Sequence, residues 1–322
     1  MKVVEQIQIM SSDRKMASFN RRSVLKAGTA AGAALLSLGP AIGRRALAQT
    51  AVATQALGES LHILTVGGVN VLVQTSAAGA LLVDGGSADT APVLLDAVTA
   101  LPGAGPIHTL FNTHWHPEQT GANRVLGEAG TKIIAQENTR LWLTTDIVYP
   151  WDESQTFDPL PAIAQPNESF FDAGELESGV RYGYLRHAAH TDGDMYVFFP
   201  DENVLAVGDA VYGEGWPFVD WWTGGWIGGI VGGLELILSL IDDATRIVPA
   251  RGPVLGRTDI ESQFQMYNTV YERLSQMLNN GGSPDEAVEA RPTAEFDAGM
   301  GQPDEFVRRS FESLWAYISP DA

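Results

Sequence analysis

The sequence has 322 residues, no cysteine and a formal net charge of −19. Without cysteine, disulfides and thiolate metal sites are excluded, so any metal site must use histidine and carboxylate ligands. The apolar fraction of 45% and the 34 glycines indicate a globular α/β protein rather than a fibrous or disordered chain.

Residues 1–48 have the pattern of an export signal. Arg21 and Arg22 precede an apolar run rich in alanine and glycine at residues 27–42, and the small residues Ala46 and Ala48 follow it. This order is typical of a secretory signal, and the paired arginines resemble a twin-arginine signal. The run is short for a membrane span. We therefore predict a periplasmic or secreted protein with no stable membrane span after signal removal; an uncleaved anchor is the alternative.

The rest of the chain, residues 49–322, is strongly acidic. It has 12 basic and 37 acidic side chains, a net charge of −25, and Lys132 is its only lysine. Such a surface repels nucleic acid and anionic lipid, so we expect neither as a partner. The expected partner is a small-molecule substrate, and the charge favours no particular oligomeric state.

Between residues 61 and 143, short apolar runs alternate with stretches of helical periodicity. A hairpin is predicted at 61–66 and 69–75, because Gly67 and Gly68 separate two runs typical of strands. Further strands are predicted at 80–84, 107–112 and 132–135, and helices at 89–101, 120–128 and 136–143.

Residues 144–166 are rich in proline and acidic side chains, and so long a loop is expected to form a lid or pocket rim. Beyond it, strands are predicted at 179–187, 194–200, 203–207 and 246–249, and helices at 227–241, 259–278 and 303–318.

Four tryptophans lie among glycines and prolines in residues 211–226, namely Trp216, Trp221, Trp222 and Trp226. Aromatic side chains in such loops suit a pocket for an apolar or aromatic substrate. Ordinary packing of the loops is the alternative.

Two histidines follow the strand predicted at 107–112. His114 and His116 are two residues apart, so extended backbone sends both imidazoles to one side. His190, in another loop between two strand-like runs, is a third candidate ligand, and His187 could support it from nearby. Three imidazoles and a water make an open zinc site of the catalytic type, whose bound water has a pKa near ~7.

These landmarks together resemble the metallo-β-lactamase superfamily. The matching motifs are His114-x-His116 after a strand, His190 in a Gly/Asp loop, Gly208-Asp209 after a strand, Val83-Asp84-Gly85-Gly86, and Pro249-Ala250-Arg251-Gly252-Pro253. The resemblance covers roughly residues 57–256 and implies an α/β (α+β) fold, a four-layer αββα sandwich with the site at one edge of the two packed sheets. We predict one such domain at 49–256 and a C-terminal helical extension at 257–322, packed on the same domain.

The resemblance also implies roles for individual residues. His114, His116 and His190 match the ligands of the first metal, and Asp209 matches the carboxylate that bridges two metals. Asp84 matches a structural carboxylate near the metal loop.

The chain departs from the family's His-x-His-x-Asp-His pattern at the second metal. Glu118 stands at the Asp position, Gln119 at the next His position, and Arg251 at the place of a late histidine. We therefore expect one zinc ion per chain. A dinuclear centre that uses Glu118 and Gln119 is an alternative, which the positive charge of Arg251 opposes.

The replaced positions suggest chemistry of their own. Arg251 is permanently cationic and could offset Asp209 and Glu118 or bind a substrate oxyanion. Asp209 or Glu118 could orient the metal-bound water and take its proton, and Gln119 could donate a hydrogen bond.

The sequence therefore predicts an exported, zinc-dependent hydrolase that cleaves an ester, lactone or amide bond through metal-bound hydroxide. The alternative is a catalytically lapsed binding protein of the same fold that retains an aromatic pocket. β-Lactam cleavage does not follow from the resemblance, because function lies in the site and not in the fold.

Overall fold

The computed structural model describes residues 51–186 and 188–318. The predicted export signal at residues 1–48 lies outside the described residues, and so does His187. No helix among the described residues is long and apolar enough to cross a membrane.

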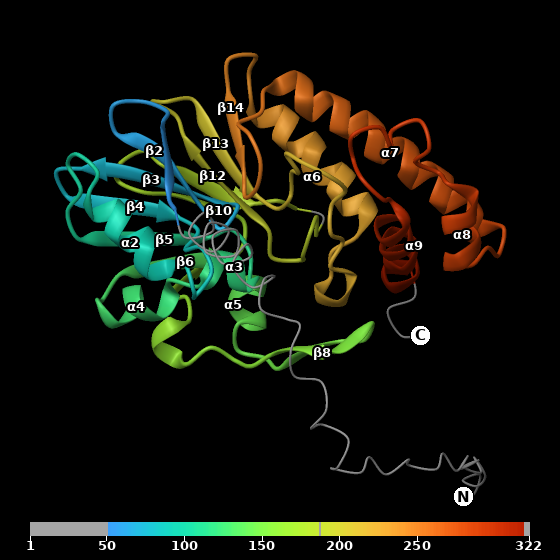
Figure 1. The fold of residues 1–322 in the computed structure, drawn as a ribbon, viewed down its shortest axis with the longest axis horizontal. Helices are drawn as coiled ribbons and strands as arrows, with labels where there is room; N and C mark the ends of the chain where they lie inside the picture. Colours follow the sequence, from blue (N-terminus) through green and yellow to red (C-terminus); the bar gives the residue numbers. More distant parts are fainter. Residues whose placement is uncertain (1–50, 187, 319–322) are drawn as a thin grey trace, which may run out of the picture. The chain divides into compact units, whose positions relative to one another are not determined.

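Two β-sheets form the centre of the described part of the chain (Figure 1). The first has seven strands in the order β1-β2-β3-β4-β5-β6-β9. Its strands are β1 (Ala53–Ala56), β2 (Leu61–Val66), β3 (Val69–Ser76), β4 (Gly79–Val83), β5 (Ile107–Asn112), β6 (Lys132–Gln136) and β9 (Glu168–Phe170). The second has five strands in chain order: β10 (Ala173–Glu175), β11 (Arg181–Tyr184), β12 (Met195–Phe199), β13 (Val204–Gly208) and β14 (Arg246–Pro249).

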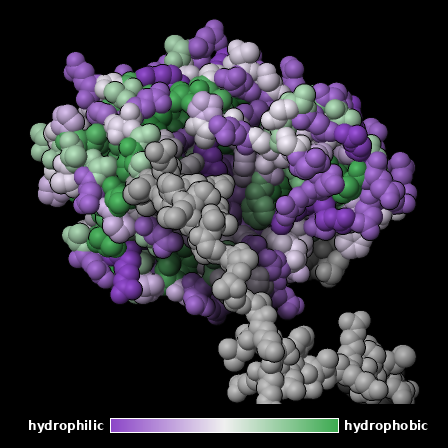
Figure 2. Space-filling view, viewed as in Figure 1, coloured by the Kyte–Doolittle hydropathy of each residue, from purple (hydrophilic) through white to green (hydrophobic). Residues whose placement is uncertain are grey.

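Helices cover the outer faces of both sheets. Buried side chains of α2 (Ala91–Thr99) and α4 (Asn123–Glu128) pack on the first sheet, and those of α6 (Ile227–Leu240), α7 (Arg257–Asn279) and α9 (Asp304–Ile318) pack on the second. Short helices lie at α3 (Pro117–Thr120), α5 (Glu137–Trp142), α8 (Pro284–Ala290), η1 (Ala162–Ala164) and η2 (Trp221–Thr223). On the face drawn in Figure 2, hydrophilic side chains dominate over α7 and α8, as expected for the solvated side of an amphipathic helix.

Buried apolar side chains also fill the space between the two sheets. Phe111 of β5 and Phe199 of β12 belong to this inner layer, together with apolar side chains of β2, β3, β4, β6, β11, β13 and β14. Helix, sheet, sheet and helix therefore form four layers, which confirms the predicted αββα sandwich. In β5, Ile107 is half-buried and residues 109–112 are fully buried, because this central strand has neighbours on both edges and both faces.

Some elements differ from those predicted. The segment 144–166, predicted as a loop, contains a hairpin of β7 (Ile147–Tyr149) and β8 (Asp152–Phe157). The polar sequence of β8 hides it, since most of its side chains face solvent and show no apolar alternation. The helix predicted at 120–128 is instead two short helices, α3 and α4, and strands β1, β9 and β10 were not predicted.

Helix α8 was also missed, although the sequence carries a signal for it. Ser283 accepts a hydrogen bond from the backbone N–H of Glu286, and the Glu286 carboxylate accepts one from the N–H of Ser283. This reciprocal capping box, followed at once by Pro284, is a recognised helix start.

Candidate metal centre

The ends of three strands bring four predicted residues together. His114 and His116 follow β5, His190 lies between β11 and β12, and Asp209 follows β13. All four are buried, and each offers one ligand atom within 4.8 Å of the others. His116 Nδ1 lies 3.1 Å from both His114 Nε2 and His190 Nε2. Asp209 Oδ2 lies 3.6 Å from His114 Nε2. The prediction that both imidazoles of the first loop reach one point is confirmed.

The spacing of the three nitrogens suits a zinc ion. Zinc binds imidazole nitrogen at ~2.0–2.1 Å in tetrahedral geometry, so two of its ligands lie about 3.3 Å apart. The observed separations of 3.1 Å are close to this value. The donor set therefore fits a metal that prefers histidine, and Asp209 is near enough to join it.

Hydrogen bonds on the far side of two rings direct their lone pairs inward. His190 Nδ1 lies 2.6 Å from the carbonyl oxygen of Phe218, which can only accept, so this nitrogen carries the proton. His116 Nε2 lies 2.9 Å from Oδ2 of Asp220, so in the neutral ring Nε2 carries the proton and Nδ1 does not. Such partners fix the tautomer and the orientation of a metal-binding imidazole.

The third ring is held by a relay that begins at Asp84. The Thr113 hydroxyl donates to the Asp84 carboxylate at 2.9 Å, and the backbone N–H of Thr113 donates at 2.8 Å. The same hydroxyl oxygen lies 3.2 Å from His114 Nδ1 and can accept its proton. The Nε2 lone pair of His114 is then left facing the cluster. Asp84, expected as a structural carboxylate, lies where the resemblance put it.

The pKa values of the three histidines are shifted in different directions. Burial lowers the pKa of His114 well below its ordinary value, and the neighbouring His116 and His190 lower it further. Burial also lowers the pKa of His190. Both rings are therefore neutral at pH 7, which is the form that binds a metal. Burial likewise lowers the pKa of His116, but the hydrogen bond and charge of Asp220 outweigh it and the net shift is upward.

Asp220 is a residue of this centre that the sequence did not reveal. It is fully buried and accepts hydrogen bonds from His116, from the Tyr149 hydroxyl at 3.0 Å and from the Thr223 hydroxyl at 2.6 Å. Burial would raise its pKa, but the hydrogen bond and charge of His116 and the Thr223 hydroxyl lower it below the ordinary value. The available signal was a lone aspartate among apolar and aromatic residues in the segment 211–226.

Two glycines let this loop and strand β13 approach the centre closely. A Cβ on Gly225 would lie 2.0 Å from the His190 carbonyl oxygen, and Gly225 N–H donates to the backbone oxygen of Asp220. Gly208 has a φ of +57°, and a Cβ there would lie 2.5 Å from the Thr113 hydroxyl. Side chains at either position would push apart the loops that carry the ligands.

A cavity of about 400 Å³ opens onto the cluster. Its lining residues include aromatic side chains from the hairpin and from the loop after β13: Tyr149, Phe157, Tyr212, Trp216 and Phe218. The expected pocket rim in 144–166 is therefore found there. Of the four tryptophans in 211–226, Trp216 alone lines this cavity. Trp221 and Trp226 instead contact Trp151 and Tyr317.

Glu118 and Arg251 lie together on the cavity wall. Arg251 Nη2 donates to Glu118 Oε1 at 2.7 Å, and each side chain is about one third exposed. Burial raises the pKa of Asp209 to about 6, while the charge of Arg251 lowers it. Arg251 thus forms an ion pair with Glu118, and its charge also acts on Asp209. Gln119, in contrast, is fully buried and is not among the residues that line the cavity.

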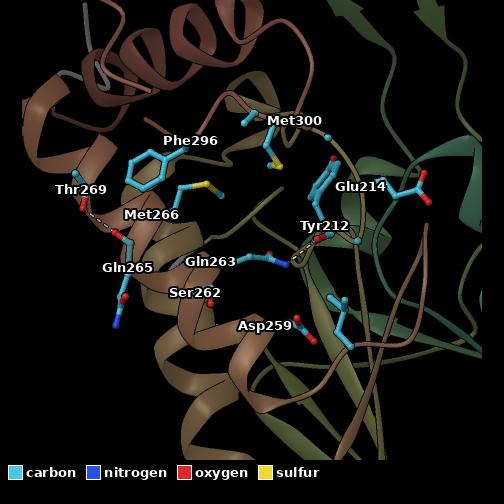
Figure 3. A pocket seen from close by; sticks show the side chains of 14 residues that line it. Tyr212, Glu214, Asp259, Ser262, Gln263, Gln265, Met266, Thr269, Phe296 and Met300 are labelled. Atoms are coloured by element: carbon cyan, nitrogen blue, oxygen red, sulfur yellow. Dashed lines mark hydrogen bonds between the residues drawn. The ribbon is translucent and has the colours of Figure 1, made fainter. Parts of the chain in front are cut away.

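A larger cavity of about 600 Å³ lies on the other side of Tyr212 (Figure 3). Gln263 donates a hydrogen bond to the backbone oxygen of Tyr212, and Met266, Phe296 and Met300 make much of its wall. Among the described residues, the cluster around His114 is the one group of histidines and carboxylates that could hold a metal. We therefore place the candidate site at the smaller cavity.

A four-layer αββα sandwich with three histidines and an aspartate at one sheet edge defines a class of metal-binding domains. Residues 64–255, more than half of the chain, match the metallo-beta-lactamase superfamily, and the chain belongs to that superfamily.

One further protein is similar in sequence, and two solved structures share the fold. The chain is 33% identical over 110 residues to a hydroxyacylglutathione hydrolase of Hyphomonas neptunium, a match that covers 34% of this chain and 36% of that protein. The chain thus matches little more than a third of that relative's length. The structure of DIM-1 metallo-beta-lactamase has a TM-score of 0.54 at 18% identity and covers 68% of this chain and 97% of its own. A metallo-beta-lactamase from Pontibacter korlensis gives 0.54 at 15% identity over 68% and 99%. At these identities the two structures show the shared fold.

Proposed function

We propose that the chain is an exported metal-dependent hydrolase that holds one zinc ion with His114, His116 and His190. A bound zinc ion would supply a Lewis acid and an activated water for attack on a carbonyl group. The proposed reaction is cleavage of an ester, lactone or amide bond in a small molecule.

The observation that carries this proposal is the orientation of the three rings. Their inward nitrogens lie at the spacing of ligands around one cation, and the outer nitrogens of His116 and His190 face groups that accept a proton. Two neutral imidazoles would otherwise be buried with lone pairs facing each other, which costs free energy. The arrangement is explained if a cation belongs there.

The other polar groups of the cavity have separate proposed roles in the reaction. Asp209 is buried beside the cluster, and its pKa near 6 leaves it largely ionised at neutral pH and able to accept a proton from water. Arg251 places a permanent positive charge at the cavity wall, where it can stabilise negative charge that develops on the substrate. Glu118 holds Arg251 in place through their ion pair.

One cation beside the cluster favours a single metal. In the sequence, Arg251 stands where the family's pattern has a late histidine, and the structure pairs it with Glu118. A second divalent ion near this guanidinium would meet like charge. We therefore propose one zinc ion per chain, with Asp209 as the nearest carboxylate.

The substrate must suit a cavity with an aromatic wall. The rings of Tyr149, Phe157 and Phe218 favour an apolar or aromatic group beside the scissile bond. The name of the Hyphomonas relative adds hydroxyacylglutathione to the candidates.

Metal content and turnover, measured together, test the proposal. Protein purified without added zinc should hold one equivalent, and it should hydrolyse at least one member of a panel of aryl esters, lactones, hydroxyacylglutathione and chromogenic β-lactams. His114→Ala should lose both metal and turnover. Metal-free, inactive parent protein that still binds aromatic esters would instead establish the second candidate, a lapsed binding protein, which the aromatic cavity favours.

Export is proposed from the sequence of residues 1–48. Expression of the full chain with Arg21 and Arg22 intact should place it in the periplasmic fraction, and replacement of both by lysine should retain it in the cytoplasm. Equal distribution of the two forms would refute a twin-arginine signal.

A further inference from the structure

Arg309 of helix α9 is a buried cation with an unusual environment. The residue is 8% exposed, and Nη2 donates to Glu305 one turn earlier on the helix. Its Nε and Nη1 atoms have no hydrogen-bond acceptor among the described residues. Instead, Cζ lies 4.0 Å from the ring centroid of Trp151 and 4.6 Å from that of Phe218. Two aromatic faces therefore compensate for much of the lost hydration of this charge.

The two rings belong to different segments that line the site. Trp151 follows β7 in the hairpin, where it stacks on Tyr149 at 4.5 Å with an interplanar angle of 22°. Phe218 lies in the loop after β13. Arg309 thus contacts both the hairpin and the loop, and it reaches them from a helix near the C-terminus.

These same segments supply the acceptors that orient two candidate ligands. Phe218 accepts from His190 through its carbonyl oxygen, and Asp220, two residues later, accepts from His116. Tyr149 of the hairpin donates to Asp220. Arg309 therefore reaches His190 and His116 only through intervening residues, of which Phe218 is the nearest.

Two further contacts from α9 hold the same loop. Trp221 Nε1 donates to Glu312 at 3.1 Å, and the backbone N–H of Ile227 donates to the Ser313 hydroxyl at 3.2 Å. The loop between Phe218 and Ile227 is therefore attached to α9 along its length. Figure 1 shows α9 beside α6, at the end of the chain and beyond the residues that match the superfamily.

We propose that Arg309 is a positioning residue for the metal centre: by joining Trp151 to Phe218, it holds the acceptors that orient His190 and His116. The proposal rests on the proposed metal-binding function. It extends the functional unit to a helix that lies outside residues 64–255.

The test compares Arg309→Ala with Arg308→Ala in the full chain. Arg308 is the adjacent arginine of the same helix, and it pairs with exposed Asp285 away from the site. Zinc affinity is measured by competition with a chromogenic chelator, and the coordination geometry is read from the visible spectrum of the cobalt-substituted protein. Arg309→Ala should weaken zinc binding by more than twofold and up to about 10-fold and shift the cobalt spectrum, since loss of a ligand's direct outer partner costs about 10- to 100-fold and Arg309 acts through such partners. Arg308→Ala should match the parent, and Arg309→Lys, which keeps a charge over the rings, should recover part of the loss.

The outcomes separate this inference from the proposed function. Parent protein that binds no zinc or cobalt refutes the proposed function, and the inference with it. Parent protein that binds metal, with Arg309→Ala within twofold of it and an unchanged cobalt spectrum, refutes the inference alone. If Arg309→Ala does not fold, Trp151→Leu removes the other half of the contact from the half-exposed hairpin. Unchanged affinity and spectrum in that variant would equally refute the positioning role.

Discussion

Replacing Asp220 with asparagine tests whether the buried loop aspartate sets the geometry of the metal centre. All four groups that face this carboxylate are donors: the ring N–H of His116, the hydroxyls of Tyr149 and Thr223, and the backbone N–H of Thr223. Burial raises the pKa of Tyr149, and the charge of Asp220 raises it further, so that hydroxyl keeps its proton. An amide offers one oxygen, and its NH₂ group must then face another donor.

The expected loss follows from this count of donors. A hydrogen bond to a charged acceptor contributes ~1.5–3 kcal/mol, and the amide must forfeit at least one of them. If the lost bond is that of His116, the ring can turn and its Nδ1 lone pair leaves the cluster. Loss of such a partner weakens metal binding by about 10- to 100-fold, or ~1.4–2.7 kcal/mol.

Zinc affinity by chelator competition, with thermal unfolding of the metal-free protein, measures both parts of the effect. Asp243→Asn is the matched control, since it removes the same charge from a side chain that is 98% exposed. It should leave zinc affinity unchanged. An Asp220→Asn protein that unfolds at the parent's temperature and binds zinc within twofold of the parent would show that Asp220 does not orient His116.

Three other outcomes are expected. Burial raises the pKa of Asp84 to about 8, so metal-free protein should lose stability as the pH rises from 6.5 to 8. In this range the folded state binds the Asp84 proton and the unfolded state does not, so the free energy of unfolding falls by up to ~1.4 kcal/mol per pH unit. In urea melts, Asp84→Asn should show a weaker dependence of this free energy on pH. Arg251→His should move metal stoichiometry toward two or change activity sharply; parent-like values of stoichiometry, activity and stability would mean that Arg251 plays no such part. Asp209→Asn should lower kcat at least 100-fold while one zinc remains bound, and parent-like turnover would remove it from the chemistry.

The sequence could predict the part of the site that depends on the spacing of residues close together in the chain. His114 and His116 follow a strand whose apolar run is continuous, so their common direction followed from the backbone alone. His190 was a candidate because it lies in a loop between two predicted strands, and the resemblance to the superfamily assigned it and Asp209 to the metal centre. The apolar periodicity likewise predicted the ends of most helices to within two or three residues.

The part that could not be predicted depends on contacts between distant segments. Asp220 is 104 residues from His116, and Arg309 is further still from Trp151. Neither has a neighbour in sequence that marks its partner, and an arginine on an amphipathic helix is ordinarily a solvated side chain. The role of Gln119 stays a prediction from the motif, and the structure places this side chain in the interior and not on the cavity wall.

The residues at the proposed metal site and those at the positions that match a second metal differ in their hydrogen-bond partners. Each first-metal histidine is backed by a partner from another element: His114 by the Asp84–Thr113 pair, His116 by Asp220, and His190 by the Phe218 carbonyl. At the second-metal positions, Glu118 and Arg251 instead satisfy one another across the cavity wall. The ion pair already neutralises the charge of Glu118, so no metal cation is needed at that point. Three converging imidazole lone pairs, in contrast, have no partner without a cation. These supports favour the proposed one-metal centre over a lapsed one, because they hold His114, His116 and His190 in the orientation that metal binding requires.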